Sequence, residues 1–338
     1  MKVARNIFET VGHTPLLKLN RVTGGLKAQV LGKLEFFSPS GSLKDRILYW
    51  MIEKAEKRGD LKPGMTIIEA TTGNTGIATS MTAAVKGYKC IIVMPTGMSE
   101  ERKKIIRAYG AELVETPGGE SDVDLTLKKV REILAKNPGK MWEVRQFSNP
   151  DNAEAHYLTT GPEIWEQTEG LVDAFVATQG TGGTISGVGK FLREKTKKVK
   201  LYAVEPKECP VLSEGKWGSH KIEGIGDGFI PDILDVDILD GIVQIASDDA
   251  VAMAQRLARE EGLFCGISSG CNVLASIRVA EAHPEYKTVV TMINDSGQRY
   301  FSTELCGEGA GDWIEASRDR APEVDLSRIK GKRYEVLR

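Results

Sequence analysis

The chain has 338 residues, which corresponds to roughly two domains on a prior of about 150 residues per domain. Charged residues make up 27% of it and hydrophobic residues 41%, and the formal net charge is −2, as in an ordinary globular protein. This balance gives no reason to expect nucleic acid or an anionic membrane surface as a partner, and no window approaches the run of about 18 apolar residues that a membrane helix needs.

The first element with a strong pattern is a helix from Asp45 to Gly59. Apolar residues recur at the i, i+3, i+4 and i+7 spacing of one buried helical face, at Leu48, Met51, Ile52 and Ala55. Residues 38–42 are all Ser, Pro or Gly, so a tight polar loop holds Lys44 where loop meets helix. The helix macrodipole is positive there and lowers the pKa of an amine, which favours attack on a carbonyl. The alternative is a surface lysine beside a helix cap.

The next segment, residues 65–79, predicts a buried strand, a polar turn at 71–76 and a helix. Beyond it the pattern predicts strands at 90–94, 112–115 and 142–144, a helix capped by Ser99, and a helix over 121–135.

Residues 174–192 repeat the order of strand, glycine-rich loop and helix. A strand that runs through glycines into a helix exposes unpaired backbone N–H groups to an anion, and Thr181 and Thr184 add hydroxyls. Neither nucleotide-binding template fits, because Thr184 stands where a P-loop needs glycine and Ile185 where the third glycine of G-x-G-x-x-G would stand. An anion loop of neither type, together with Lys44, predicts a phosphorylated carbonyl cofactor.

The remaining elements are strands at 201–204, 242–245 and 289–293 and a helix from Ser247, its predicted cap, to Gly262. Alternating strands and helices imply an α/β fold with mostly parallel, twisted sheets and helices on both faces. The five cysteines form no Cys-x-x-Cys pair, and the N-terminal residues lack the apolar core of a signal peptide. We therefore expect reduced thiols, no metal site and a cytoplasmic location.

Six motifs occur in the order expected of one enzyme family. They are Gly-His-Thr-Pro-Leu (12–16), Ser-Gly-Ser-Leu-Lys-Asp-Arg (40–46), Thr-Thr-Gly-Asn-Thr-Gly (71–76), Gly-Thr-Gly-Gly-Thr (180–184), Gly-Ile-Gly-Asp-Gly-Phe-Ile-Pro (224–231) and Gly-Ile-Ser-Ser-Gly (266–270). From about residue 7 to residue 303 the chain resembles the cysteine synthase and cystathionine β-synthase family of fold-type II pyridoxal-phosphate enzymes, and most closely the O-acetylserine sulfhydrylases.

The resemblance implies two three-layer domains of the tryptophan synthase β type. The large, cofactor-binding domain would comprise residues 1–47 and 151–338, and residues 48–150 would form a smaller, mobile domain that carries the substrate loop. Ligands of such sheets bind beyond the carboxyl ends of the strands, so the cofactor is expected in the cleft between the domains.

The resemblance also assigns roles around pyridoxal 5′-phosphate. Lys44 would form the Schiff base and then serve as the base at Cα, while Asn74 would contact the ring hydroxyl. Ser268, or less favourably Ser269, would face the pyridine nitrogen, and a hydroxyl there suits β-elimination because it draws little charge into the ring. The residues that match the phosphate loop are Gly180, Thr181, Gly182, Gly183 and Thr184. The residues that match the clamp on the substrate carboxylate are Thr71, Thr72, Gly73, Thr75 and Gln146.

Other polar residues are expected to be less important. His13 is interpreted as a structural hydrogen-bonding residue, because pyridoxal already supplies a base. Asp295 and Arg299 follow a strand and either support the cofactor pocket or form a plain surface turn. Beyond Thr303 the tail contains no recognisable regulatory domain.

Two positions depart from the commonest sulfhydrylase pattern. Thr72 replaces a serine in the asparagine loop, which narrows the space beside the substrate carboxylate. Asp227 stands between two glycines where a small apolar residue is usual. A carboxylate there suits a general acid or base toward a hydroxyl or water, and the alternative is a solvent-exposed loop aspartate.

The predicted reaction is β-replacement on an activated L-serine or L-cysteine through an aminoacrylate, with cysteine formation from O-acetyl-L-serine and sulfide as the first choice. The alternatives are a cystathionine β-synthase, a cysteine/serine hydroxyl lyase that releases sulfide, and a non-catalytic partner protein on the same fold. O-phosphoserine is disfavoured because residues 224–231 contain no arginine for a second phosphate. The resemblance further implies a homodimer, which in this family can hold a partner's C-terminal peptide in the active-site mouth.

Overall fold

The structure is a computed structural model that describes residues 3–307 and 324–338. Its strands are β1 (Leu16–Leu19), β2 (Gln29–Leu34), β3 (Thr66–Ala70), β4 (Lys89–Pro95), β5 (Glu112–Thr116), β6 (Met141–Glu143), β7 (Ala174–Thr178), β8 (Lys200–Pro206), β9 (Gly241–Ile245), β10 (Thr288–Ile293) and β11 (Glu335–Leu337). Its α-helices are α1 (Lys44–Arg58), α2 (Asn74–Lys86), α3 (Glu100–Ala108), α4 (Val123–Lys136), α5 (Asp151–Ala155), α6 (Gly161–Gln167), α7 (Gly183–Lys195), α8 (Val211–Glu214), α9 (Ser247–Arg256) and α10 (Ile267–Ala282). Short 3₁₀ turns are η1 (Ile7–Thr10), η2 (Glu35–Phe37), η3 (Glu120–Asp122), η6 (Gly297–Tyr300) and η7 (Glu304–Cys306), and π turns are η4 (His156–Thr160) and η5 (Leu257–Glu261).

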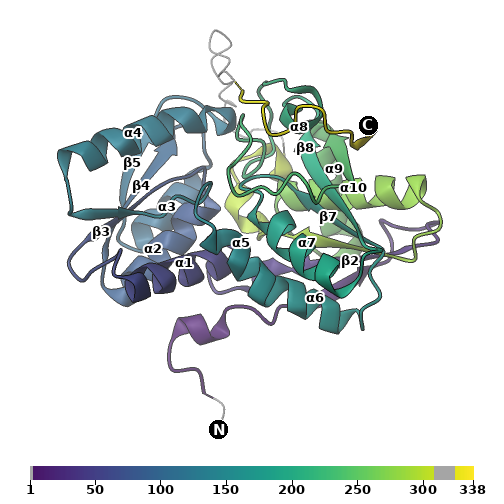
Figure 1. Cartoon of the computed structure of the whole chain (residues 1–338), viewed down its shortest axis with the longest axis horizontal. Coiled ribbons are helices and arrows are strands. Elements are labelled where there is room, and N and C mark those ends of the chain that lie inside the picture. The colour runs from purple at the N-terminus through teal and green to yellow at the C-terminus, as the bar shows by residue number, and fades with distance from the viewer. Residues whose placement is uncertain (1–2, 308–323) are drawn as a thin grey trace.

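The strands form two sheets that lie side by side, one on the left and one on the right of Figure 1. The four-stranded sheet has the order β5-β4-β3-β6, and the seven-stranded sheet has the order β1-β2-β10-β7-β8-β9-β11. All neighbouring pairs are parallel except β1 with β2. This arrangement confirms the predicted α/β fold with two mostly parallel sheets.

Each sheet is covered on both faces because its strands alternate their buried side chains. In β4, Ile92 packs toward α1, α2 and α3, whereas Val93 packs toward α4. In β7, Phe175 packs toward α6 and α7, whereas Val176 packs toward α9 and α10. Side chains with a period of two therefore place a hydrophobic core on each face of each sheet, which gives two three-layer units.

The predicted helix after the polar loop is α1. All four predicted core residues, at 48, 51, 52 and 55, are buried, and Gly59 caps the helix with φ 78°. A left-handed residue at this position turns the chain out of the helix, and glycine adopts it without steric cost. The buried face of α1 packs in the core of the four-stranded sheet.

Several features differ from the predicted pattern, which did not include β1, β2, α5, α6, α8 or α10. Ser247 begins α9 but does not cap it, because Ala246 holds the N-cap position and the Ser247 hydroxyl accepts a hydrogen bond from Lys221 N at 3.0 Å. The tail adds an unpredicted edge strand, β11, which pairs with β9. The expected boundary at residue 47 falls inside α1, and the division into domains stays a prediction. Among the residues described, no helix is long and apolar enough to cross a membrane.

Candidate active site

Four helices begin at one cavity between the two sheets. Lys44 opens α1, Asn74 opens α2, Gly182 precedes α7, and Ser268 lies in the first turn of α10, and all four residues line the cavity. Within the described chain, none of these helices has an N-cap side chain that accepts a hydrogen bond from its first turn. Their first backbone N–H groups and positive dipole ends therefore favour an anionic ligand in the cavity.

Lys44 is half-buried in the cavity, and the loop before it is tied to the segment that follows β10. Leu43 N donates to Asn294 O at 3.0 Å, Ser296 N donates to Gly41 O at 3.2 Å, and the Arg299 guanidinium donates to Ser40 O. The pKa of Lys44 is lowered to about 8, chiefly because burial disfavours the charged amine, while the charges of Asp227 and Asp295 act in the opposite direction. Part of the amine is therefore neutral near pH 7.

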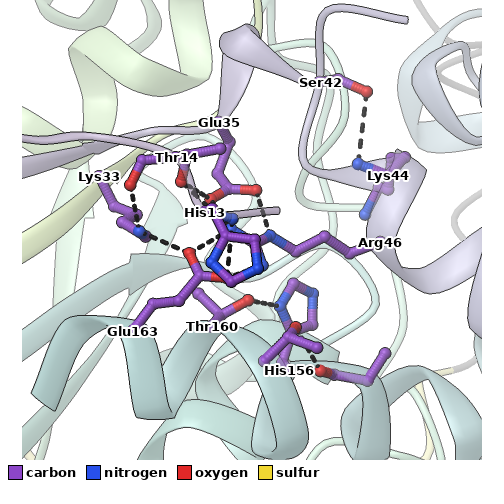
Figure 2. Close-up of polar contacts among 12 residues, drawn as sticks. His13, Thr14, Lys33, Glu35, Ser42, Lys44, Arg46, His156, Thr160 and Glu163 are labelled. Atoms are coloured by element: carbon purple, nitrogen blue, oxygen red, sulfur yellow. Dashed lines mark hydrogen bonds and ion pairs between the residues drawn. The ribbon is translucent and has the colours of Figure 1, made fainter. Parts of the chain in front are cut away.

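Two residues beyond Lys44, a buried ion-pair network fixes the first turn of α1 (Figure 2). Arg46 Nε donates to Glu35 Oε2 at 2.7 Å, and Arg46 Nη1 donates to Glu163 Oε1 at 2.7 Å. Lys33 Nζ lies 2.7 Å from Glu163 Oε2, and Thr14 Oγ1 donates to Glu35 Oε1 at 2.7 Å. Burial alone would lower the pKa of Arg46, but the two carboxylates raise it above its ordinary value. The network thus anchors the lysine-bearing helix to β2, η2 and α6.

The glycine-rich loop after β7 brings its backbone close to the cavity. A Cβ on Gly182, whose φ is +82°, would lie 2.6 Å from Leu234 Cβ, and one on Gly180 would lie 2.5 Å from Gly224 O. Gly183 does not line the cavity, and a Cβ there would lie 2.1 Å from Asn152 Oδ1. Packing therefore disfavours side chains at these three positions, and the main chain of Gly180 and Gly182 lines the cavity directly.

The two threonines of this loop are held by side chains behind it. Asn152 Nδ2 donates to Thr181 Oγ1 at 3.2 Å, and Thr184 Oγ1 lies 3.2 Å from Nε2 of His156. The other ring nitrogen of His156 lies 2.9 Å from Thr160 Oγ1 (Figure 2). Burial holds the pKa of His156 well below its usual range, so the ring is neutral and acts as a hydrogen-bonding support.

The asparagine loop also lines the cavity, with Thr71, Thr72, Asn74 and Thr75. Gln146 also lines it, but its amide is occupied: Thr75 Oγ1 donates to Gln146 Oε1 at 2.6 Å, and Gln146 Nε2 donates to Ala70 O at 3.0 Å. Gly73 lies outside the lining, and a Cβ there would be 2.1 Å from Arg102 Cδ.

The segment after β10 contributes Asn294, which the sequence pattern did not single out, as well as Asp295 and Arg299, which it did. Asn294 lines the cavity, and its Nδ2 donates to Ser268 Oγ at 3.0 Å. Ser269 Oγ instead accepts from Asn294 N at 2.9 Å and does not line the cavity, so of the two serines Ser268 is the one that faces it. Asp295 and Arg299 are both buried, and Asn74 Nδ2 donates to Asp295 Oδ2 at 2.6 Å. The surface-turn alternative for these two residues is therefore wrong.

Asp227 faces the same cavity as Lys44 and is only 6% exposed, so the alternative of a solvent-exposed loop aspartate is wrong. Its loop is held by Gly226, whose N donates to Gln179 O at 3.1 Å and whose O accepts from Nε2 of His220 at 2.9 Å. Burial raises the pKa of the Asp227 carboxyl, and the charge of Lys44 acts in the opposite direction. A carboxyl group that titrates near neutral pH suits proton transfer.

A second buried carboxylate, Glu120, was not predicted to take part. Glu120 Oε1 accepts from Gly224 N at 2.9 Å, three residues before Asp227. Burial and the neighbouring Asp227 raise the pKa of Glu120. No local pattern distinguishes this glutamate, because its proximity to Asp227 arises from long-range packing.

His13, by contrast, is exposed and lies outside the cavity lining, and its backbone N donates to Glu163 Oε1 at 3.0 Å.

The cavity fits a phosphorylated pyridoxal group. The uncapped start of α7 offers backbone donors for a phosphate, Lys44 offers an amine for the aldehyde, and Ser268 offers a hydroxyl. Asn74 Oδ1 is buried and has no hydrogen-bond partner among the described residues, as expected of an atom that meets a ligand. All five cysteines are free, and no group of metal-ligating side chains occurs within residues 3–307 and 324–338.

The chain is also similar to known proteins that use pyridoxal phosphate. The family model described as pyridoxal-phosphate dependent enzyme matches residues 7–295. The cysteine synthase of Staphylococcus aureus is 48% identical over 305 residues, which cover 90% of this chain and 97% of that protein. The crystal structure of O-acetylserine sulfhydrylase isoform 3 from Entamoeba histolytica matches with a TM-score of 0.84 and 44% identity, over 90% of this chain and 92% of that one. A hydrogen sulfide-producing enzyme from Fusobacterium nucleatum matches with a TM-score of 0.84 and 40% identity, over 88% of this chain and all (100%) of that one. The chain belongs to the family of pyridoxal-phosphate dependent enzymes.

Proposed function

We propose that this protein catalyses β-replacement on an activated L-serine and that its principal reaction forms L-cysteine from O-acetyl-L-serine and sulfide. The observation that carries the proposal is the convergence of Lys44, the loop at 180–184 and the threonine-rich loop at 71–75 on one cavity. The similarity to a cysteine synthase and to an O-acetylserine sulfhydrylase supports the choice of substrate. A non-catalytic role is disfavoured, because a scaffold needs neither a reactive lysine nor an anion loop.

In this proposal Lys44 Nζ holds the cofactor aldehyde, and the main chain of residues 180–184 holds its phosphate. Asn74 contacts the ring hydroxyl, and Ser268 contacts the pyridine nitrogen. When bound, pyridoxal phosphate supplies an electron sink that acidifies Cα and lets the β-substituent leave. Lys44 Nζ accepts the proton from Cα, since a pKa of about 8 leaves the amine partly neutral at pH 7.

The substrate carboxylate is proposed to lie against Thr71, Thr72, Thr75 and the backbone of Gly73. The uncapped start of α2 supplies donors for a negative group there. Gln146 holds Thr75 Oγ1 and Ala70 O, so it keeps this loop in shape as well as lining the cavity.

The reaction is tested by incubating purified holoenzyme with O-acetyl-L-serine, L-serine or L-cysteine, each with sulfide or homocysteine, and identifying the products by mass. We expect the fastest reaction with O-acetyl-L-serine and sulfide. Cystathionine as the dominant product, or no β-replacement with any pair, contradicts the proposal.

The phosphate assignment predicts that Gly182→Val weakens cofactor binding more than Thr181→Val does. Loss of the Thr181 hydroxyl removes one hydrogen bond and is expected to cost about 1–3 kcal/mol. Valine at 182 must adopt φ +82° and place its Cβ against Leu234, so it displaces the loop itself. Equilibrium dialysis of the cofactor measures both variants. An unchanged affinity in Gly182→Val excludes this loop as the phosphate site.

A second activity, exchange of hydroxyl and thiol at Cβ with release of sulfide from cysteine, is favoured by Asp227. Acetate leaves readily without protonation, whereas hydroxide is a poor leaving group and water is a poor nucleophile. A positioned carboxyl group therefore accelerates the loss of hydroxide and the attack of water, but not the loss of acetate. General acid or base catalysis of this kind contributes typically about 10²–10⁴-fold. Two matching structures are of hydrogen sulfide-producing enzymes.

Asp227→Ala is therefore expected to reduce the serine- and cysteine-dependent reactions by about 10²-fold or more and to leave O-acetylserine turnover largely intact. Rates of all three reactions in wild type and variant, measured side by side, provide the test. A uniform loss, or no loss, means that Asp227 only shapes its loop.

Further features are proposed on the resemblance. We expect residues 48–150 to move as a substrate-loop domain against residues 1–47 and 151–338, which hydrogen exchange with and without substrate would detect. We also propose a cytoplasmic homodimer that can hold a partner's C-terminal peptide in the cavity mouth. Light scattering gives the oligomeric state, and competition between a peptide and O-acetylserine gives the peptide site.

A further inference from the structure

Arg102 is a fully buried cation that the proposed reaction does not use. It ranks among the largest fully buried side chains, in the first turn of α3. Its Nη1 pairs with the Glu223 carboxylate and donates to Ser99 Oγ at 3.2 Å, and its guanidinium carbon lies 4.4 Å from the centre of the Tyr300 ring. A buried guanidinium lowers stability unless its charge is compensated, so these partners define where its charge acts.

A chain of short hydrogen bonds leads from Arg102 to the cavity. Arg102 Nη2 donates to the Tyr300 hydroxyl at 2.6 Å, and that hydroxyl donates to Asp295 Oδ2 at 2.8 Å. The same Asp295 oxygen accepts from Asn74 Nδ2 at 2.6 Å, and Arg102 Nη2 itself lies 3.7 Å from it. One carboxylate oxygen thus connects the buried cation to the amide that lines the cavity.

This chain crosses between the two sheets. Arg102 and Asn74 belong to α3 and α2 of the four-stranded unit, whereas Asp295 and Tyr300 follow β10 of the seven-stranded unit. Arg102 also packs directly against the backbone before α2, because a Cβ on Gly73 would lie 2.1 Å from its Cδ. Arg102 therefore contacts the residue that immediately precedes Asn74, in addition to its link through Tyr300 and Asp295.

We infer that Arg102 is a positioning residue that acts through Tyr300 and Asp295 to orient the Asn74 amide and to balance the negative charge beside it. Asn74 donates a hydrogen bond from Nδ2 to Asp295, so the other end of its amide, Oδ1, is directed to the ligand. Asn74 Oδ1 has no protein partner among the described residues. The inference rests on the proposed function, in which Asn74 contacts the ring hydroxyl of the bound cofactor.

Other groups near Asp295 set the size of the effect. Burial raises the pKa of Tyr300, so its hydroxyl stays protonated and donates. Lys44 and Arg299 are cations that interact with Asp295. The charge of Asp295 also contributes to the raised pKa of the buried Cys265 thiol. Arg102 reaches the Asn74-bound oxygen of Asp295 in two ways, through the Tyr300 hydroxyl and directly with Nη2 at 3.7 Å. Removing the hydroxyl therefore takes one hydrogen bond from the Asp295 carboxylate and leaves the charges of Arg102, Lys44 and Arg299 in place.

The decisive experiment uses holoenzyme and the conservative variant Tyr300→Phe, which keeps the ring under Arg102 and removes the hydroxyl link. The visible absorbance of the bound cofactor is recorded across pH. We expect the pH midpoint of its spectral change to rise by about one unit. Without the Tyr300 hydroxyl, the negative charge of Asp295 is less compensated. That charge disfavours ionisation of the neighbouring ring hydroxyl and favours the protonated form of the Lys44 nitrogen. Arg102→Lys keeps the charge but not the forked geometry, so its midpoint should lie between those of wild type and Arg102→Met.

Tyr202→Phe is the matched control. Tyr202 is a buried tyrosine of β8 whose hydroxyl lies 2.9 Å from Nε2 of His283, away from the cavity, so its loss should leave the absorbance midpoint unchanged. If Tyr300→Phe binds the cofactor with the wild-type midpoint, the inference is overturned while the proposed function stands. If the wild type itself binds no pyridoxal phosphate, the proposed function fails first. A folded Tyr300→Phe with a raised midpoint supports the inference even if Arg102→Met does not fold.

Discussion

Lys44→Ala is expected to reduce β-replacement by about 10⁴-fold or more, because the substitution removes both the covalent attachment of the cofactor and the base at Cα. The fold should tolerate the change, since Lys44 is the first residue of α1 and only half-buried. Lys54→Ala, on the same helix but paired with Glu154 at the surface, is the control and should keep activity. Borohydride reduction of the holoenzyme followed by peptide mapping should locate the pyridoxyl group on Lys44. A pyridoxyl group on any other lysine contradicts the assignment.

The lowered pKa of Lys44 adds a pH dependence to this prediction. With a pKa of about 8 the amine is mostly protonated at pH 7 and mostly neutral at pH 9. Only the neutral amine attacks an aldehyde, so capture of pyridoxal phosphate by cofactor-free protein should accelerate by about tenfold between these values. Stopped-flow absorbance measures the rate. A rate that falls with rising pH would show that another group limits capture.

Arg46→Ala is expected to lower the free energy of unfolding by about 3–5 kcal/mol, because it leaves Glu35 charged and buried without its partner. Glu35 is fully buried (0% exposed), and its two oxygens receive hydrogen bonds from Arg46 at 2.7 and 2.9 Å. Guanidinium chloride unfolding provides the measurement. Lys57→Ala, on the same helix with a side chain 73% exposed, should change the free energy of unfolding by no more than about 1 kcal/mol.

The double variant Arg46→Met with Glu35→Gln separates charge from packing. It removes both buried charges and should recover much of the stability lost in Arg46→Ala. Cofactor binding need not recover with it, because the network also holds the first turn of α1 and hence Lys44. Equal stability of Arg46→Ala and Lys57→Ala would mean that the network is not a major stabilising feature.

Local structure was largely predictable from residue patterns. The period of α1, its glycine cap and the strands that became β3, β4, β5, β7, β8, β9 and β10 follow from short-range rules of burial and backbone geometry. The glycine-rich loops and Lys44 were recognisable for the same reason, since each requirement is met within a few consecutive residues. Ser247 was mistaken for a cap because the competing partner of its hydroxyl, Lys221, lies 26 residues away.

The contacts that complete the site were not predictable in this way. Asn74 meets Asp295 across 221 residues of sequence, and Arg102 meets Tyr300 across 198. Residue spacing carries no information about such pairs, because they depend on how the two sheets pack against each other. The same packing places Asp227 and Lys44 in one cavity and directs Ser268, not Ser269, toward it. It also brings Arg102 so close to residue 73 that only glycine fits there. Residue types and their short-range order thus specify the helices, the strands and the reactive lysine. The electrostatic environment of that lysine is set instead by distant side chains from two separate sheets, because their approach depends on long-range packing.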